Sequence, residues 1–351
     1  MFFLLFLVIT LAFLLSFFVT PLVIKIFRSH NWVENPLEKQ KKTGNATATS
    51  IIPRGGGLPI FISLLVTSLV FLPPDKHLIG ILMASFFTLI IGLIDDIKDI
   101  SPVFRLSTNF LTALIVVAAG IGIAYLSNPL GGIINLTEPQ ILINFLGTHS
   151  IWIFADLLAV FWIVWCMNFV GWSSGVEGQL PGFVSISAIF IGLLGLRYST
   201  DTTQWPVIIL AFTVAGAYLG FLPYNFYPQK IMPGYSGKSL AGLLLAVLSI
   251  LSGAKLATLI FLLGIPMLDA FFVLFYRLIH HKSPFKSDNN HLHHQLLKLG
   301  WGRRRIAVFY WSLTLLFGLL SLFLNSQQKF YTFIGIAIIF FAFTLKFFRR
   351  I

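Results

Sequence analysis

The first 27 residues, MFFLLFLVITLAFLLSFFVTPLVIKIF, contain no charged side chain before Lys25. Crossing the hydrocarbon core of a bilayer takes about 20 consecutive apolar residues, so this stretch predicts a transmembrane helix over residues 2–27. Its apolar run is longer than that of a signal peptide, no basic residue precedes it, and no small-residue cleavage site is evident. The stretch therefore indicates an integral membrane protein.

The rest of the chain has the same character. The whole chain of 351 residues is 57% hydrophobic and 10% charged, whereas a soluble domain carries about 25% charged residues. We expect one all-α domain over residues 1–351, a polytopic membrane helix bundle of about 11 transmembrane helices. The eighth segment is short, so ten crossings stay an alternative. The expected segments are 2–27, 57–73, 78–95, 104–126, 150–168, 181–197, 205–223, 239–253, 256–278, 306–324 and 330–347.

Lysine and arginine indicate the orientation, because cytoplasmic loops carry an excess of them. With the N-terminus outside, 20 of the 24 Lys and Arg residues fall on the cytoplasmic side, and only Lys76, Arg197, Lys255 and Lys329 fall outside. The net charge of +12 then reflects topology and the lipid bilayer, not a nucleic-acid partner. We expect a multi-pass protein of the cell inner membrane, with a cytoplasmic C-terminus and cytoplasmic active-site loops at 28–56, 95–104, 168–181, 224–238 and 279–305.

Three aspartates, Asp95, Asp96 and Asp99, end the third segment. Their spacing puts them on one side of a helix if the helix continues. Three anions at a helix C-terminus repel one another and oppose the macrodipole, so this pattern favours a carboxylate cluster for a hard cation such as Mg²⁺. The structural alternative is a helix end that faces water, with Lys98 and Arg105 as counter-ions.

Three histidines, His291, His293 and His294, follow in a strongly basic segment. A zinc site is one interpretation, but there is no nearby cysteine and only one nearby carboxylate, Asp288. Binding of phosphate or diphosphate fits this basic segment better, with histidine as a donor or proton carrier. A solvated basic loop is the structural alternative.

Two further segments are rich in glycine. KIMPGYSGKSL, residues 230–240, has two residues between Gly234 and Gly237 where a P-loop needs four, and no strand is expected before it, so a P-loop is rejected. It retains Lys230, Lys238 and the start of an apolar helix, whose N-terminus can bind an anion. NFVGWSSGVEGQLPG, residues 168–182, carries one carboxylate, Glu177, as a candidate ligand or base.

Taken in order, these segments resemble the polyprenyl-phosphate N-acetylhexosamine-1-phosphate transferase superfamily. The resemblance covers most of the chain, from IPRGGGLPIF at 52–61 to Arg305, and includes DDIKD, NFYPQK at 225–230 and PMLDAF at 266–271. The segment SPFKSDNNHLHHQLLKLG, 283–300, is the most specific match and is similar to the N-acetylglucosamine-type members. The resemblance implies a bundle of ten or eleven helices that transfers a sugar 1-phosphate from a UDP-sugar to polyprenyl (undecaprenyl) phosphate, releases UMP and needs Mg²⁺.

Together with the chemistry above, the resemblance implies roles for particular residues. Asp95 and Asp96 are expected to be catalytic and associated with the metal. His291, His293 and His294 are also expected to be catalytic. The expected substrate-binding residues are Arg54, Asp99, Arg105, Asn168, Glu177, Asn225, Lys230, Lys238 and Asp288. A homodimer stays open.

The chain departs from the family pattern at two places. After Asn168 the family reads Asn-x-x-Asp-Gly-x-Asp-Gly, whereas this chain has Gly171 for the second Asn, Ser174 for the first Asp and Glu177 for the second Asp. In residues 230–240 the family has Gly-Asp-x-Gly-Ser with a metal-binding Asp, and this chain has Tyr235. A phenol with a pKa of about 10 is a poor Mg²⁺ ligand.

These departures leave alternatives. Glu177 or another carboxylate such as Asp269 takes the role of the missing Asp, or the metal is held differently, or activity is lost. The second hypothesis is therefore a catalytically inactive relative that binds UDP-sugar or polyprenyl phosphate. A membrane transporter is the third, although the charges gather at one face. We expect Tyr235 to lie close to Asp95 and Asp96, facing the substrate phosphates.

Overall fold

The computed structural model describes residues 2–43, 50–128, 131–144, 148–252, 255–283 and 290–348. Its helices are α1 (Phe2–Ser29), α2 (Pro36–Thr43), α3 (Gly57–Phe71), α4 (Lys76–Lys98), α5 (Pro102–Ala118), α6 (Ile153–Trp172), α7 (Gln179–Gly195), α8 (Gln204–Asn225), α9 (Gly234–Leu251), α10 (Lys255–Leu262), α11 (Gly264–Ile279), α12 (Leu292–Lys298), α13 (Arg303–Phe323) and α14 (Ser326–Phe348). A short 3₁₀ helix spans Leu196–Tyr198.

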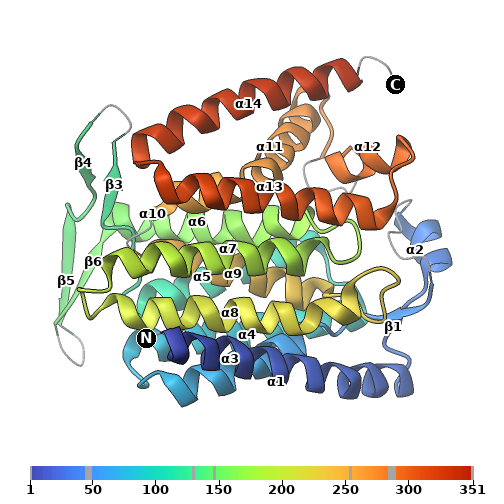
Figure 1. The fold of residues 1–351 in the computed structure, drawn as a ribbon, viewed down its shortest axis with the longest axis horizontal. Coiled ribbons are helices and arrows are strands. Elements are labelled where there is room, and N and C mark those ends of the chain that lie inside the picture. Colours follow the sequence, from blue (N-terminus) through green and yellow to red (C-terminus); the bar gives the residue numbers. More distant parts are fainter. Residues whose placement is uncertain are drawn as a thin grey trace.

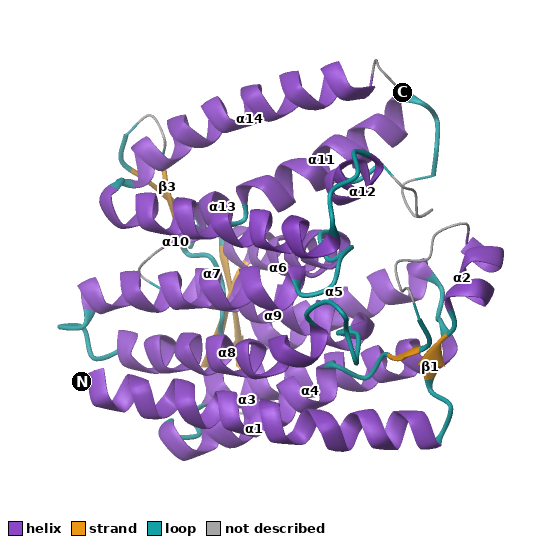
Figure 2. Ribbon diagram, turned by 45° about the vertical axis from the view of Figure 1, so that its right-hand side comes forward, coloured by secondary structure: helices purple, strands orange, loops and turns teal. Residues whose placement is uncertain are grey.

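The strands form three antiparallel pairs, each of two strands. β1 (Val33–Glu34) pairs with β2 (Ile52–Pro53), so that Val33 lies opposite Pro53. β3 (Tyr125–Ser127) pairs with β4 (Ile133–Asn135), and β5 (Gln140–Asn144) pairs with β6 (Thr148–Trp152). In the described part of the chain these short pairs are the only strands, and helices make up the rest of the regular structure (Figure 2), so the all-α prediction is confirmed.

The predicted apolar segments correspond to helices. Eight described helices are long and apolar enough to cross a membrane, and α10 with α11 makes a ninth candidate that is bent by 80°. The shorter apolar helices α3 and α5 account for the other two predicted segments. The protein is therefore a multi-pass membrane protein. The number of crossings and the orientation stay predictions.

Several predicted boundaries differ from the observed ones by a few residues, and the largest differences concern the fourth and eighth segments. The fourth segment ends at Ala118 instead of 126, because Gly120 adopts a φ of +87°, which ends the helix. The fifth segment begins at Ile153, after β6, instead of 150. The predicted loop 224–238 is shorter than expected, because α9 begins at Gly234. Tyr235 and Lys238 consequently lie on the first turns of a helix.

The helices α7, α8 and α9 form the buried centre of the bundle, while α1 and α14 are mostly exposed. α9 packs on α4 and α6, α8 packs on α1 and α7, and α13 packs on α7. The start of α9 approaches α3 and α4 closely, because a Cβ at Gly57 or Gly92 would collide with Ser236. This contact places the end of α4 against the start of α9.

The bundle has two distinct ends. In Figure 1 the hairpins β3–β4 and β5–β6 and the start of α1 lie at one end, and α2, β1, α12 and the C-terminal end of α14 lie at the other. α5 begins beside the end of α4 and runs toward the hairpins. The candidate site described below lies at the end away from the hairpins.

Candidate active site

Asp96 joins the end of α4 to the start of α9. Its carboxylate is buried and accepts hydrogen bonds from the backbone N–H of Tyr235 at 2.6 Å and from the hydroxyl of Ser236 at 2.6 Å. Helix N-termini carry unsatisfied N–H groups and favour negative charge, so Asp96 caps α9 although it belongs to another helix. A Cβ at Gly234, which has a φ of +66°, would collide with Asp96 and with the carbonyl of Arg54.

Asp95 and Asp99 lie beside Asp96 and bind arginine. The Nε of Arg105 donates to Asp95 Oδ1 at 2.6 Å, and the backbone N–H of Ile100 donates to the same oxygen at 3.1 Å. The Nη1 of Arg54 donates to Asp99 Oδ1 at 2.7 Å. Asp95 Oδ2 is buried without a hydrogen-bond partner, 3.6 Å from Arg54 Nη2.

We call Glu34, Asp95, Asp96 and Asp99 the acidic cluster. Arg54 lies among all four, because its Nε is also 3.6 Å from Glu34 Oε2 and 3.7 Å from Asp96 Oδ1. Lys39 Nζ completes the surroundings at 3.0 Å from Asp99 Oδ1. With Arg105, these cations almost balance the acidic cluster.

The charges of the cluster shift the pKa values of Asp99 and Arg54, two residues that lie outside the candidate membrane spans. Burial on its own would raise the pKa of Asp99, but hydrogen bonds from Arg54 and Lys39 outweigh burial and lower it to about 2. Burial would lower the pKa of Arg54, but the charge of Asp96 and the hydrogen bond to Asp99 outweigh it and raise this pKa further above its usual value. Both groups are therefore charged at neutral pH.

Tyr235 lies against this cluster as predicted, but its phenol points to α5. The hydroxyl donates to Asn109 Oδ1 at 3.0 Å, and the guanidinium carbon of Arg105 lies 5.1 Å from the centre of the ring. Cation–π contact at this range is favourable. Tyr235 therefore helps to hold Arg105 in its position on Asp95.

The segment between α6 and α7 is fixed by buried polar contacts. Arg303 Nη1 lies 2.8 and 2.9 Å from the two carboxylate oxygens of Glu177, which is 3% exposed. The side-chain oxygen of Asn225 accepts from the backbone N–H of Gly178 at 3.0 Å. Gln229 Nε2 reaches Glu177 at 3.4 Å. Glu177 is thus bound to Arg303, and Asn225 organises the loops around it.

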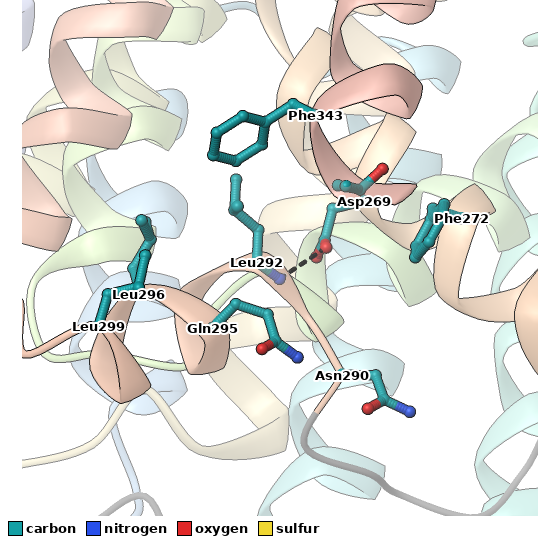
Figure 3. Close-up of a pocket in the computed structure, with 9 residues that line it drawn as sticks. Asp269, Phe272, Asn290, Leu292, Gln295, Leu296, Leu299 and Phe343 are labelled. Atoms are coloured by element: carbon teal, nitrogen blue, oxygen red, sulfur yellow. Dashed lines mark hydrogen bonds between the residues drawn. The ribbon is translucent and has the colours of Figure 1, made fainter. Parts of the chain in front are cut away.

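The histidine segment is bound to α11. Asp269 is buried, accepts the backbone N–H of Leu292 at 2.7 Å and lies 2.9 Å from His291 Nδ1. Figure 3 shows the hydrogen bond from Leu292 to Asp269 at the edge of a largely apolar pocket between α11, α12 and α14, which Phe272 and Phe343 also line. In the described part of the chain, neither Asp269 nor Glu177 bonds to Asp95 or Asp96. Replacement of the missing family Asp by either carboxylate therefore finds no support in the geometry.

A second pocket lies between the segments that the sequence singled out. Lys238 from α9 lines it together with Ser174, Gly175 and Glu177, and with Asn225 and Gln229 at the end of α8 and beyond. His293 is buried directly behind Gly175, where a Cβ would collide with its ring. Burial lowers the pKa of His293 well below its usual value, and the neighbouring His294, His291 and Lys238 lower it further, so this imidazole is neutral. We call this hollow the Lys238 pocket.

The other predicted residues have different positions. Asn168 lies within α6 and donates to the carbonyl of Val164 at 2.7 Å. Lys230 is exposed, with Nζ 6.0 Å from the ring centre of Tyr224. His294 lies beside His293, with ring centres 4.3 Å apart. Asp288 lies outside the described residues.

Sequence reasoning did not single out Glu34, Lys39, Asn109, Ser236 or Arg303 as site residues. Ser236 adjoins Tyr235 in a segment that was already noted, and Arg303 opens a run of three arginines. Glu34 and Lys39 had no local signal, because their partners Arg54 and Asp99 lie far along the chain. Among the described residues, no three His, Cys, Asp or Glu side chains converge in a way that could hold a metal ion.

Comparison with known proteins gives one family. Residues 78–253 match the model of the family described as Glycosyl transferase family 4. The chain is 26% identical to a probable undecaprenyl-phosphate N-acetylglucosaminyl 1-phosphate transferase of Bacillus subtilis, over 88% of this chain and 81% of that protein. It is 28% identical to a decaprenyl-phosphate N-acetylglucosaminephosphotransferase of Mycobacterium leprae, over 90% and 83%. It is 29% identical to a phospho-N-acetylmuramoyl-pentapeptide-transferase of Staphylococcus haemolyticus, over 92% and 99%.

Proposed function

This chain belongs to glycosyl transferase family 4, and from that premise we propose that it is a sugar-1-phosphate transferase. The proposed donor is a UDP-sugar, which supplies N-acetylhexosamine 1-phosphate, and the proposed acceptor is polyprenyl (undecaprenyl) phosphate. UMP is the second product. The names of the relatives support this choice, since two of them pair N-acetylglucosamine with a polyprenyl phosphate. Such a product starts synthesis of a cell-envelope glycan.

One observation carries the proposal. The adjacent carboxylates Asp95 and Asp96 are buried at one end of the bundle, where α4, α9 and the segment around Arg54 meet. Ionisable groups at the end of a membrane helix are usually functional, because burying them is costly. Arg54 and Arg105 beside these carboxylates suit an enzyme that binds two phosphorylated substrates.

In the proposed reaction an oxygen of the lipid phosphate attacks the β-phosphorus of the UDP-sugar. The bond between that phosphorus and the bridging oxygen breaks, and UMP leaves with the bridging oxygen. Phosphoryl transfer of this kind depends mostly on positioning and on neutralising charge. Arg54 and Arg105 are suited to the second task, since guanidinium groups bind phosphate oxygens with two N–H donors.

Asp95 is suited to orienting the lipid phosphate. Its Oδ2 atom is buried and accepts no hydrogen bond in the structure, so a P–O–H group that reached it would satisfy it, while its Oδ1 is fixed by Arg105. If the lipid phosphate arrives protonated, this oxygen takes the proton, as a general base must lie within hydrogen-bond reach. Asp96 has a different role, because both of its carboxylate oxygens accept hydrogen bonds from the start of α9.

A divalent metal is generally expected for phosphotransferases of this kind, and Mg²⁺ at Asp95 and Asp96 is the finer expectation from the sequence. Mg²⁺ prefers several free oxygen ligands in octahedral geometry. Here Asp96 is occupied by α9, Asp95 and Asp99 are bound to arginine, and Tyr235 stands at the place of the family's ligand. These residues do not fit the ion as they stand, so the mechanism above includes no step through it.

The proposal also includes the side of the membrane on which the site lies and the organisation of the chain into one domain. We place the site on the cytoplasmic face of the inner membrane, because 20 of 24 Lys and Arg residues fall on that side in the expected topology. The whole chain, 1–351, would act as one transferase domain, with the lipid tail in the bilayer. A homodimer stays an open point of the proposal.

The test is a panel of UDP-sugars with polyprenyl phosphate and the purified protein in lipid nanodiscs. We expect release of UMP and formation of a lipid-linked sugar with at least one donor. Binding of a UDP-sugar without UMP release from any donor would refute the enzyme and support the inactive relative, which Tyr235 and Ser174 favour. The exposed Asp201 provides a control, because Asp201→Asn should not change the rate.

A further inference from the structure

Lys238 lies on the first turns of α9, beside the loop between α6 and α7. Its side chain lines the Lys238 pocket. In the part of the chain that the structure describes, its Nζ makes no hydrogen bond and no ion pair. The side chain is half-buried, and hydrogen bonds between an ammonium and a phosphate are stronger than those between neutral groups, so this lysine suits an anionic ligand.

The nearby carboxylates cannot supply that anion. Glu177, the one carboxylate that lines the pocket, is held by Arg303. Glu34 and Asp96 attract Lys238, but Glu34 is bound to Arg54 and Asp96 caps α9. Arg54 and Lys39 also repel Lys238. The charge on Lys238 is thus available to a ligand.

The lining of the pocket mixes apolar and polar side chains, and Glu177 is its one carboxylate. His293 lies behind Gly175, and its Nδ1 atom is buried without a hydrogen-bond partner. Asn225 and Gln229 add amide groups to the lining, and Ser174 adds a hydroxyl. A lysine beside neutral polar groups suits a phosphorylated ligand, and the one carboxylate of the lining is already held by Arg303.

The sequence of α9 links this cation to the missing metal ligand. Gly234–Lys238 lies where the resemblance has Gly-Asp-x-Gly-Ser, with Tyr235 for the Asp and Lys238 for the Ser. The first change removes one negative charge and the second adds one positive charge. Together they shift the local charge by the same two units that a divalent cation would supply.

We propose that the ammonium of Lys238 is a built-in cation that binds the diphosphate of the donor nucleotide in place of a divalent metal. The inference rests on the proposed function for the identity of that nucleotide. It goes beyond the proposed function because it assigns the charge neutralisation to a residue of this chain. It also makes nucleotide binding independent of added metal.

The test measures binding of UDP, which carries the diphosphate common to all UDP-sugars, by calorimetry in nanodiscs. In the presence of EDTA we expect the wild-type protein to bind UDP more tightly than UMP. A hydrogen bond to a charged group contributes about 1.5–3 kcal/mol, so Lys238→Met should weaken UDP binding about 10-fold to 100-fold. Lys25→Met removes an exposed lysine from α1 and should change it less than about twofold.

A second variant tests the replacement of the metal. Tyr235→Asp combined with Lys238→Ser restores the family sequence, and UDP binding by this variant should require Mg²⁺ and disappear with EDTA. The inference is overturned if wild-type UDP binding disappears with EDTA, or if Lys238→Met binds UDP as the wild type does. The thermal unfolding midpoint of each variant identifies any that fail to fold.

Different results would overturn the proposed enzyme activity and the proposed role of Lys238. Metal-free UDP binding that depends on Lys238, without UMP release from any donor, overturns the enzyme but supports the inference. UMP release that needs Mg²⁺ and survives Lys238→Met supports the enzyme and overturns the inference.

Discussion

The ion pair between Glu177 and Arg303 provides the sharpest test of how the site is held together. Replacing Arg303 by Met leaves a carboxylate that is 3% exposed, with Gln229 Nε2 at 3.4 Å as its remaining side-chain donor. Removing one partner of a buried pair costs about 3–5 kcal/mol. Because the Arg303 side chain is 19% exposed, water partly replaces it, and we expect the lower end, about 3 kcal/mol.

A second substitution, at Glu177, distinguishes the lost attraction of the ion pair from the cost of a buried carboxylate without a partner. Glu177→Gln on the Arg303→Met background removes the uncompensated charge and leaves an amide that can still bond to Gln229. We therefore expect the double variant to be about 2 kcal/mol more stable than Arg303→Met alone, since the larger part of the cost is desolvated charge. Such a gain from a second substitution is the signature of a buried pair.

The assay is denaturant unfolding in detergent micelles, followed by tryptophan fluorescence. Arg28→Met, at the exposed end of α1, is the matched control and should stay within about 0.5 kcal/mol of the wild type. The reasoning is refuted if Arg303→Met differs from that control by less than about 1 kcal/mol. It is also refuted if the double variant is no more stable than the single one.

Three further predictions concern the site and its frame. Asp96→Asn should lower UMP release by at least about 100-fold, because it removes a buried charge beside the reacting phosphates; an unchanged rate would contradict its assignment. Gly92→Val should destabilise the protein by at least about 1–3 kcal/mol, because its Cβ meets the backbone of Ser236, whereas Gly335→Ala, which has open space, should not. The pKa of His293 is lowered by burial, so the folded protein should lose stability as pH falls below about 6.5, by at most about 1.4 kcal/mol per pH unit. Unfolding at pH 7.5 and at 5.5, compared between wild type and His293→Gln, measures this, and equal pH dependence would contradict it.

The helices were predictable because each crossing needs a long apolar run, and such runs are visible in the chain itself. The start of α9 was placed too late for a tertiary reason. Its first residues, Gly234 and Tyr235, lack a local side-chain cap, and the cap comes from Asp96 on another helix. A local pattern of Gly, Lys and Ser therefore predicted a loop where the folded protein has a helix.

The site was predictable as a set of segments but not as a set of bonds. The aspartates at the end of α4 were visible as charges in an apolar chain, and Tyr235 was expected close to them. Glu177 was noticed as a lone carboxylate, but its partner Arg303 is 126 residues away. Such pairings depend on how α13 packs against α7, which the spacing of residues along one segment does not specify.

The separation of the hairpins from the acidic cluster has a practical consequence for experiments on intact cells. Helix α5 spans 17 residues between the two ends, about 25 Å at 1.5 Å per residue. The single cysteine, Cys166, is buried, so a cysteine introduced at the exposed Asn135 in β4 would be the one accessible thiol. A maleimide that does not enter cells would label it only if the hairpins face outward. One reagent thus assigns each end of the molecule to a compartment.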